Sequence, residues 1–141
     1  MLEPMTSIET LPKGFRFPST KVQLTREWVG EYMAAVEDGT TAELLPNSAP
    51  PMALLTLAIR SLLENATLPS GALHAGQELE IQRPANVGEE ITIDGEVAGK
   101  GERQGWILLS IAFAVSDAQG RPLITGRTTL TTPASAGAGK I

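Results

Sequence analysis

Few side chains in this chain could carry acid–base or nucleophilic chemistry. His74 is the only histidine and cysteine is absent, which excludes a thiolate nucleophile, a thiolate metal site and a site built from several histidines of one chain. Asp38 and Glu43 have four residues between them, and two such carboxylates can polarise a water molecule when one of them has a raised pKa. We therefore expect any acid–base chemistry to use Asp38, Glu43 or His74, with no metal and no cofactor.

The size and charge of the chain limit what these residues could act on. The 141 residues are 42% hydrophobic and 19% charged, which is typical of one globular domain. The net charge of −5 and the lack of any run of Lys or Arg argue against a nucleic-acid partner. No apolar stretch approaches the roughly 20 residues of a membrane span. We expect a cytoplasmic single domain over residues 13–132, with a flexible N-terminus (1–12) and a flexible tail (133–141).

Two helices are predicted to position the candidate residues. Thr25 is a good N-cap, and the apolar residues after it recur at helical spacing. Pro50 and Pro51 favour the first turn of a second helix. The first part of that helix, residues 52–59, is apolar apart from Thr56. A helix that is apolar on every side must be surrounded by protein, so we expect it to form the centre of the core.

Four later segments alternate between apolar and polar residues with a period of two, the pattern of half-buried strands. They cover residues 78–83, 90–97, 106–116 and 122–132, with turn residues between them. An earlier segment, residues 15–24, is interrupted by Pro18 and is expected at a sheet edge. Short turns between alternating strands indicate an antiparallel meander. One antiparallel sheet curved around one buried helix is the α+β arrangement called the hot-dog fold, and this is the fold class we predict.

Segment 106–116 carries no charge on either face of its predicted strand. One face is bulky and apolar, and the second face consists of Trp106, Leu108, Ser110, Ala112 and Ala114. A solvent-facing side would carry charges, so we expect this strand to be central and its second face to be covered. The sheets of two hot-dog protomers commonly join, which suits a chain with unprotected strand edges. We expect a homodimer or a pairing with a catalytic hot-dog chain.

Several segments resemble the MaoC-like acyl dehydratases and hydratases. GALHAGQELEIQRP over residues 71–84 and NVGEEITIDGEV over 86–97 are similar to the sheet of that family. DAQGRPLITGRT over 117–128 is similar to its last hairpin, and Ala-Pro-Pro over 49–51 matches the start of its central helix. The closest likeness is to the N-terminal, non-catalytic-type repeat of members that have two hot-dog repeats. The resemblance covers about residues 20–132.

The resemblance implies reversible addition of water to a trans-2-enoyl thioester of coenzyme A or acyl carrier protein. The family's signature is an Asp and a His with four residues between them, and the two side chains activate one water molecule. Asp38 stands where the Asp would fall, but Glu43 takes the place of the His. We therefore expect an incomplete dyad. The simpler readings, which we favour residue by residue, are a helix end at Asp38 and a structural hydrogen bond at His74.

The same resemblance suggests residues that bind substrate. The start of the central helix, at Pro51 and Met52, would offer backbone N–H groups to the thioester oxygen. Asn47 could lie beside the thioester, although capping of the helix by Asn47 or Ser48 is the reading we favour. Arg83 could contact a phosphate of coenzyme A, although a solvated strand end is the simpler interpretation.

We predict a MaoC-like protein that binds acyl thioesters, is related to (R)-specific enoyl-CoA hydratases and 3-hydroxyacyl dehydratases, and needs a partner chain for a complete dyad. One alternative is a divergent but complete hydratase that uses Asp38, Glu43 or His74. A second is an acyl-CoA thioesterase, which is disfavoured because residues 52–59 contain no carboxylate. A third is an assembly module without catalytic activity.

Overall fold

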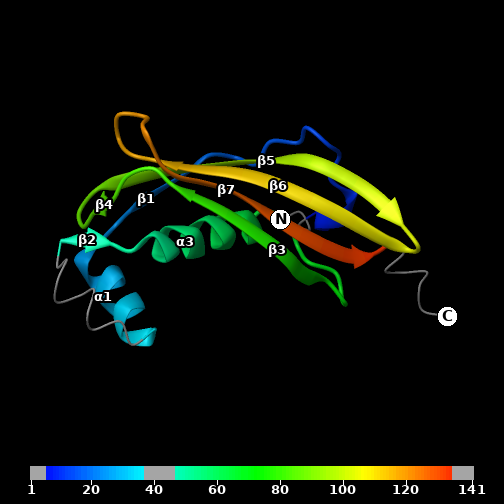
Figure 1. Cartoon of the computed structure of the whole chain (residues 1–141), viewed down its shortest axis with the longest axis horizontal. Helices are drawn as coiled ribbons and strands as arrows, with labels where there is room; N and C mark the ends of the chain where they lie inside the picture. Colours follow the sequence, from blue (N-terminus) through cyan, green and yellow to red (C-terminus); the bar gives the residue numbers. More distant parts are fainter. Residues whose placement is uncertain (1–5, 37–46, 135–141) are drawn as a thin grey trace, which may run out of the picture.

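In the computed structural model, which describes residues 6–36 and 47–134, one long sheet lies over one central helix (Figure 1). The five strands of this sheet run in the order β1-β5-β6-β7-β3, and all neighbouring pairs are antiparallel. They are β1 (Thr20–Gln23), β3 (Leu73–Ile81), β5 (Glu90–Arg103), β6 (Trp106–Ser116) and β7 (Pro122–Pro133). The predicted α+β hot-dog arrangement is confirmed, with β6 at the centre of the sheet.

Smaller elements close the two ends of the sheet. A 3-10 helix, η1 (Ile8–Thr10), precedes β1, and helix α1 (Arg26–Ala35) follows it. Two short strands, β2 (Ser48–Ala49) and β4 (Ala85–Asn86), pair with each other in front of the central helix. No helix among the described residues is both long and apolar enough to cross a membrane.

Helix α1 begins where the sequence predicted it. The Thr25 hydroxyl accepts a hydrogen bond from the backbone N–H of Trp28 at 3.0 Å, which satisfies one of the unpaired N–H groups of the first turn. Val29 and Met33 are buried, but Val36, just past the end of the helix, is 50% exposed. The helix therefore buries a narrow stripe and lies on the surface.

The central helix α3 (Pro51–Leu63) is covered on one side by the curved sheet. Its buried residues are Ala53, Leu54, Leu55, Leu57, Ala58, Ser61 and Leu62. The other side is open, because Met52 is 53% and Leu63 39% exposed, and Thr56 between them is exposed too. The helix was expected to be surrounded on every side, but it is buried only on the side that faces the sheet.

The N-terminal segment packs further into the core than its composition suggested. Ile8 is completely buried and Leu11 is 5% exposed, and both belong to the cluster around the C-terminal half of α3. The backbone N–H of Ile8 donates to the carbonyl of Thr67 at 2.8 Å. Packing therefore begins within residues 1–12, the segment that was expected to be flexible.

Strands β5 and β6 form a longer hairpin than the sequence pattern predicted. The expected strand ended at Val97, because the glycines that follow were interpreted as a turn. Instead, β5 continues to Arg103 through an irregularity between Val97 and Gly99. The turn itself is Gln104-Gly105, with φ angles of 54° and 83°, and such a pair of positive φ angles is what a two-residue hairpin turn needs.

Candidate functional site

An apolar pocket of about 160 Å³ lies between the C-terminal half of α3 and the inner face of the sheet. It is lined by Ile8, Ile59, Leu62, Leu63, Leu68, Ala72, Leu73, His74, Ile111, Thr128 and Leu130. Of these side chains, only His74 and Thr128 carry hydrogen-bonding groups. A pocket of this kind suits an alkyl group, with polar contacts limited to one wall.

The two polar side chains of the lining, His74 and Thr128, are joined by a short hydrogen-bond network centred on Gln77, which lies behind them. The Thr128 hydroxyl donates to Gln77 Oε1 at 2.9 Å, and His74 Nε2 lies 3.1 Å from the same oxygen. The Gln77 amide nitrogen donates to the backbone carbonyls of Glu78 at 2.9 Å and Arg127 at 3.2 Å. Both amide hydrogens are therefore used by the backbone, which fixes Oε1 as the group that faces His74.

This arrangement assigns the tautomer of the neutral His74 ring. Gln77 Oε1 is an acceptor only, so His74 Nε2 must carry the hydrogen that lies between them. The Nδ1 atom of a neutral imidazole is then an acceptor with a free lone pair. His74 can thus accept a proton or a hydrogen bond at Nδ1 while Gln77 holds its other nitrogen.

Sequence reasoning missed Gln77 because of a bulge in β3. In a regular strand, residues three apart point to opposite faces, so His74 and Gln77 would not meet. The register shifts between His74 and Gly76, and as a result His74 pairs with Leu130 and Gln77 with Thr128, both on the inner face. The extra residue, Ala75, brings the two polar side chains to the same side.

The start of α3 differs from the sequence expectation. Pro50 is the N-cap residue and no side chain caps the first turn, so the favoured reading of Asn47 and Ser48 as caps is wrong. Asn47 Oδ1 accepts a hydrogen bond from Arg26 Nη2 at 3.0 Å, and the Asn47 carbonyl accepts from the Val87 N–H at 2.8 Å. Asn47 therefore links α1 to the β4 segment.

Arg83 belongs to an ion-pair cluster around a buried carboxylate. Its Nη1 lies 3.7 Å from Asp117 Oδ2, and Arg121 Nε donates to the same oxygen at 2.9 Å. Burial alone would raise the pKa of Asp117, but hydrogen bonds from the Arg121 and Gln119 backbone N–H groups and the Arg121 guanidinium outweigh it, so the pKa is lowered. Arg83 therefore forms an ion pair with Asp117, whereas the simpler interpretation had its side chain in contact with solvent only.

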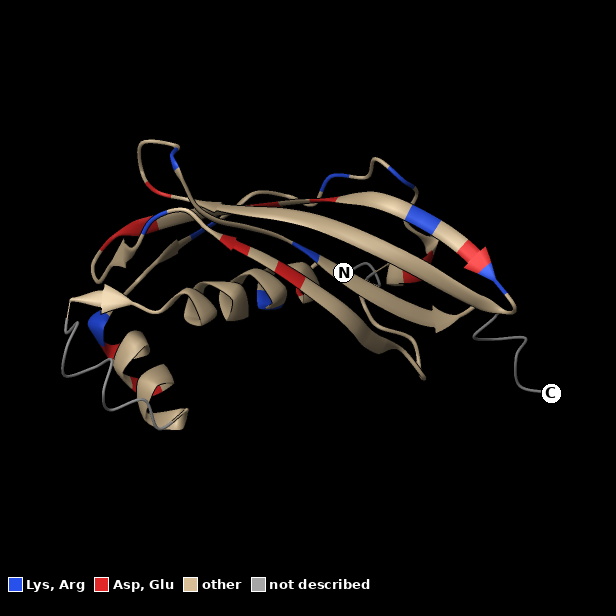
Figure 2. Ribbon diagram, viewed as in Figure 1, with Lys and Arg blue, Asp and Glu red and all other residues tan. Residues whose placement is uncertain are grey.

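The predicted site residues fall at two ends of the molecule. Figure 2 shows basic segments beside β4 and in the β6–β7 loop, at the end of the sheet where α3 begins. Pro51, half-buried, and Met52 lie at this end, as does Arg83. His74 lies at the other end of β3, about 20 Å from Ile81, because these two residues pair with Leu130 and Ile124, which are six residues apart on β7. Asp38 and Glu43 lie outside the described residues.

Among the described residues, no three His, Asp or Glu side chains gather where they could hold a metal ion. The described residues combine an apolar pocket that has His74 on its wall with a basic cluster, Arg83 and Arg121 around Asp117, at the far end of the sheet.

Comparison with known proteins gives a family match and a set of similar folds. The model of the FAS1-like dehydratase domain region matches residues 13–126. The R-hydratase PhaJ1 of Pseudomonas aeruginosa, unliganded, is 19% identical, with a TM-score of 0.71 over 87% of this chain and 83% of that chain. The (R)-hydratase of A. caviae involved in PHA biosynthesis is 20% identical, with a TM-score of 0.71 over 88% of this chain and 98% of that one.

A third similar structure is a complex. The C-terminally truncated HadBC (3R-hydroxyacyl-ACP dehydratase) of Mycobacterium tuberculosis is 19% identical, with a TM-score of 0.68 over 88% of this chain and 99% of that chain. No curated protein matches the sequence. At these identities the solved structures establish a shared fold, a long antiparallel sheet over a central helix.

Proposed function

The chain belongs to the family of FAS1-like dehydratase domain regions, and from this premise we propose that it binds acyl thioesters and takes part in the reversible hydration of enoyl thioesters. The observation that carries the proposal is the apolar pocket between α3 and the sheet, with His74 on its polar wall. Apolar walls hold an alkyl chain, and one polar wall orients the group that reacts.

The lining of the pocket suits an acyl chain. Its volume is about 160 Å³, and nine of its eleven lining residues are apolar. Burial of each methylene group in such a pocket contributes about 0.8 kcal/mol. An acyl chain would occupy the pocket, and the carrier would remain outside.

The proposed activity depends on a partner chain. By the resemblance, Glu43 stands where the family's His would fall, and the only histidine is His74. His74 lies at the opposite end of β3 from Arg83 and from the start of α3, so one chain does not combine the base with the basic cluster. A partner that supplies Asp and His would complete the dyad.

The open edge of β3 is where such a partner would attach. Strand β3 is the last strand of the sheet and pairs only with β7 among the described residues, and an unpaired edge favours the addition of another strand. Antiparallel pairing of two β3 edges about their midpoints would set His74 of one chain beside the Arg83 end of the other. This supports a homodimer or a pairing with a catalytic hot-dog chain.

Two thioesters test binding and hydration separately. Butyryl-CoA should raise the melting temperature of the purified chain, because a ligand that prefers the native state stabilises it. The chain alone should hydrate crotonyl-CoA poorly, because general acid–base help contributes about 10²–10⁴-fold and one dyad member is missing. Absence of any thermal shift would refute acyl-thioester binding and would favour the assembly module. Release of free thiol would indicate a thioesterase.

The Nδ1 atom of His74, which has no hydrogen-bond partner among the described residues, favours one alternative, a divergent hydratase that is complete in one chain. In that case the lone chain hydrates crotonyl-CoA readily, and His74→Ala lowers kcat without unfolding the protein. Asp38→Asn and Glu43→Gln are the matched comparisons, because each removes a charge and keeps the side-chain size. Ready hydration by the lone chain would overturn partner dependence and leave acyl-thioester binding in place.

A further inference from the structure

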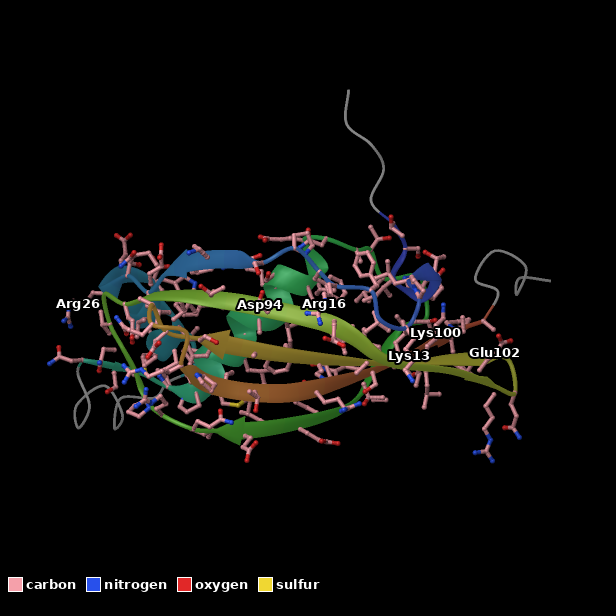
Figure 3. All side chains as sticks on the ribbon, turned by 90° about the horizontal axis from the view of Figure 1, so that it is seen from above. Lys13, Arg16, Arg26, Asp94, Lys100 and Glu102 are labelled. Carbon is pink, nitrogen blue, oxygen red and sulfur yellow. The ribbon has the colours of Figure 1, made fainter. Side chains whose placement is uncertain are left out.

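The outer face of the sheet, made of the side chains that point away from α3, is uncovered in the described part of the chain. Figure 3 looks onto this face, with Arg16 and Asp94 over β5. Along β6 it presents Trp106, Leu108, Ser110, Ala112 and Ala114, and of these Trp106 is 40% and Leu108 45% exposed. Large apolar side chains on an exposed sheet face often mark an interaction surface.

A row of charged residues crosses this face from edge to edge. Arg16 forms a bridge with Glu96, and Glu96 pairs with Ala112 of the central strand. Ala112 pairs with Arg127, which in turn pairs with Glu78 of the edge strand. Directly opposed residues of antiparallel strands share a face. The charge row therefore reads plus, minus, neutral, plus, minus, with its centre on β6.

Side-chain contacts confirm that the charge row lies on the outer face. Arg127 Nη1 donates to Ser110 Oγ at 2.7 Å, across to β6. Arg16 Nη2 lies 3.6 Å from Glu96 Oε1, and these two side chains are 81% and 41% exposed. Glu78 is exposed as well. All four charges are therefore within reach of another molecule.

When the charge row is read from its other end, each plus stands where a minus stood and each minus where a plus stood. We propose that the outer face binds the outer face of a second copy of this chain, about a two-fold axis that runs parallel to β6. Such an axis places β5 of one copy over β7 of the other, so Glu96 faces the partner's Arg127 and Arg16 faces the partner's Glu78. Every charge of the row then meets its opposite, and the row carries no net charge.

The charge row also excludes the other two-fold arrangement. An axis perpendicular to β6 within the plane of the interface would leave each strand over its own copy. Arg127 would then face Arg127, and Glu96 would face Glu96. Opposed like charges suppress association, so the proposed contact has the two β6 strands parallel, within the roughly 30° that sheet twist imposes on aligned sheets.

The residues around the charge row suit a close sheet-to-sheet contact. In the neighbouring row, Gly99, Ser110 and Thr129 lie side by side, and small side chains let two sheets approach. Farther along β6, Leu108 lies near the proposed axis and would meet its own copy. The apolar end of the face would thus be buried in the same contact that pairs the charges.

This interaction is independent of the acyl-thioester chemistry and of pairing through β3. The β3 edge stays open when two outer faces meet, and both contacts together would give an assembly larger than a dimer. Isologous contacts of this kind are closed, so the outer-face contact joins two copies and does not extend further.

Charge reversal provides a sharp test by sedimentation of the full chain. The two-fold axis creates two equivalent contacts between position 96 of one copy and position 127 of the other. Arg127→Glu places two glutamates at each contact, and Glu96→Arg places two arginines there. Each variant alone should have about half the mass of the wild-type assembly, and an equimolar mixture of the two should restore it, because each contact then joins opposite charges. Arg60→Glu, an exposed position on α3 away from the outer face, changes the net charge by the same amount as Arg127→Glu and should sediment like the wild type.

The two outcomes are distinguishable. If either variant alone keeps the wild-type mass, or if the mixture does not recover it, the proposed contact is wrong. Circular dichroism shows whether each variant is folded, and the residues are exposed, so a folding defect is not expected. Pairing through the β3 edge does not depend on the charge row. If it occurs, it multiplies the masses of the wild type and of every variant by the same factor.

A crosslink tests the direction of the axis. The chain has no cysteine, so Leu108→Cys introduces a single thiol close to the proposed axis. Oxidation should join two copies through Cys at this position, whereas an axis perpendicular to β6 through Ala112 would keep the two thiols apart. Asp94→Cys, away from the axis on β5, is the matched control and should not crosslink.

Discussion

Gln77 has an effect on the candidate site that goes beyond its own contacts. Its amide donates to two backbone carbonyls, so its oxygen must serve both Thr128 and His74. A glutamine fixed in this way selects one of the two neutral forms of the imidazole. The chemistry available at the pocket therefore depends on a residue that does not line it.

This selection can be measured, because His74 is the only histidine. At alkaline pH the nitrogen NMR spectrum should show one dominant tautomer, with the hydrogen on Nε2. Gln77→Leu should raise the share of the form with the hydrogen on Nδ1, since no acceptor then holds the hydrogen on Nε2. Thr128→Val, which leaves Gln77 Oε1 in place, should keep the dominant form. A mixture in the wild type would contradict the assignment.

Asp117 should make the stability of the protein depend on acid pH. Hydrogen bonds and the Arg121 guanidinium lower the pKa of its buried carboxyl. A carboxyl whose pKa is lower in the folded state stabilises the protein above its unfolded pKa of about 3.9, and this stabilisation is lost as the pH falls through the folded pKa. Asp117→Asn should therefore be less stable than the wild type at neutral pH, and the difference should shrink below about pH 4. Urea unfolding at several pH values measures it, and a constant difference would contradict the linkage.

At the scale of elements, two glycines of the sheet are predicted to respond differently to the same substitution. A Cβ atom at Gly126 would lie 2.5 Å from the carbonyl oxygen of Glu78 and 2.6 Å from the ring of Phe113, whereas at Gly101 nothing lies within 4 Å. Gly126→Ala should therefore cost about 1–3 kcal/mol through overpacking between β3, β7 and the core.

Gly101→Ala is the matched control, because the same methyl group enters open space on β5. Urea unfolding of the two variants should give a clear loss for the first and little change for the second. Equal stabilities would show that β3 and Phe113 can move apart, and the close contact at Gly126 would then have no energetic role.

The main elements followed from periodicity because they bury one face against a single core. Ile107, Leu109, Ile111, Phe113 and Val115 alternate and are all buried, as predicted. The pattern failed where the backbone departs from regular geometry. The bulge at Ala75 hid the contact between His74 and Gln77, and another irregularity near Val115 allows both Leu123 and Ile124 to be buried.

Part of the candidate site was accessible from the sequence, and part was not. His74 and Arg83 could be selected by residue type alone. Their separation along β3, and the link from Arg83 to Asp117, depend on tertiary pairing between strands that are distant in sequence. Local patterns carry no information on such contacts, so the sequence offered His74 and Arg83 as separate candidates without placing one relative to the other.

For the whole molecule, the N-terminal segment should contribute to stability. Ile8 and Leu11 are buried in the core cluster beside α3, and full burial of such a side chain contributes about 1.5–3 kcal/mol. A chain that begins at Lys13 should therefore unfold at a lower urea concentration than the full chain. Lys13→Ala in the full chain, at an exposed position, should have little effect. Equal stability of the shortened chain would show that the segment only rests on the core.

The bulge at Ala75 has a consequence for how this protein could diverge. Side chains along a strand alternate between two faces, and an insertion or deletion in a regular strand turns every side chain on one side of it to the other face. A bulge instead absorbs one extra residue. Loss of Ala75 would leave His74 and Gln77 two positions apart in a regular strand, where they would still point to the same face. A single codon deletion at this place would thus keep the imidazole beside its glutamine.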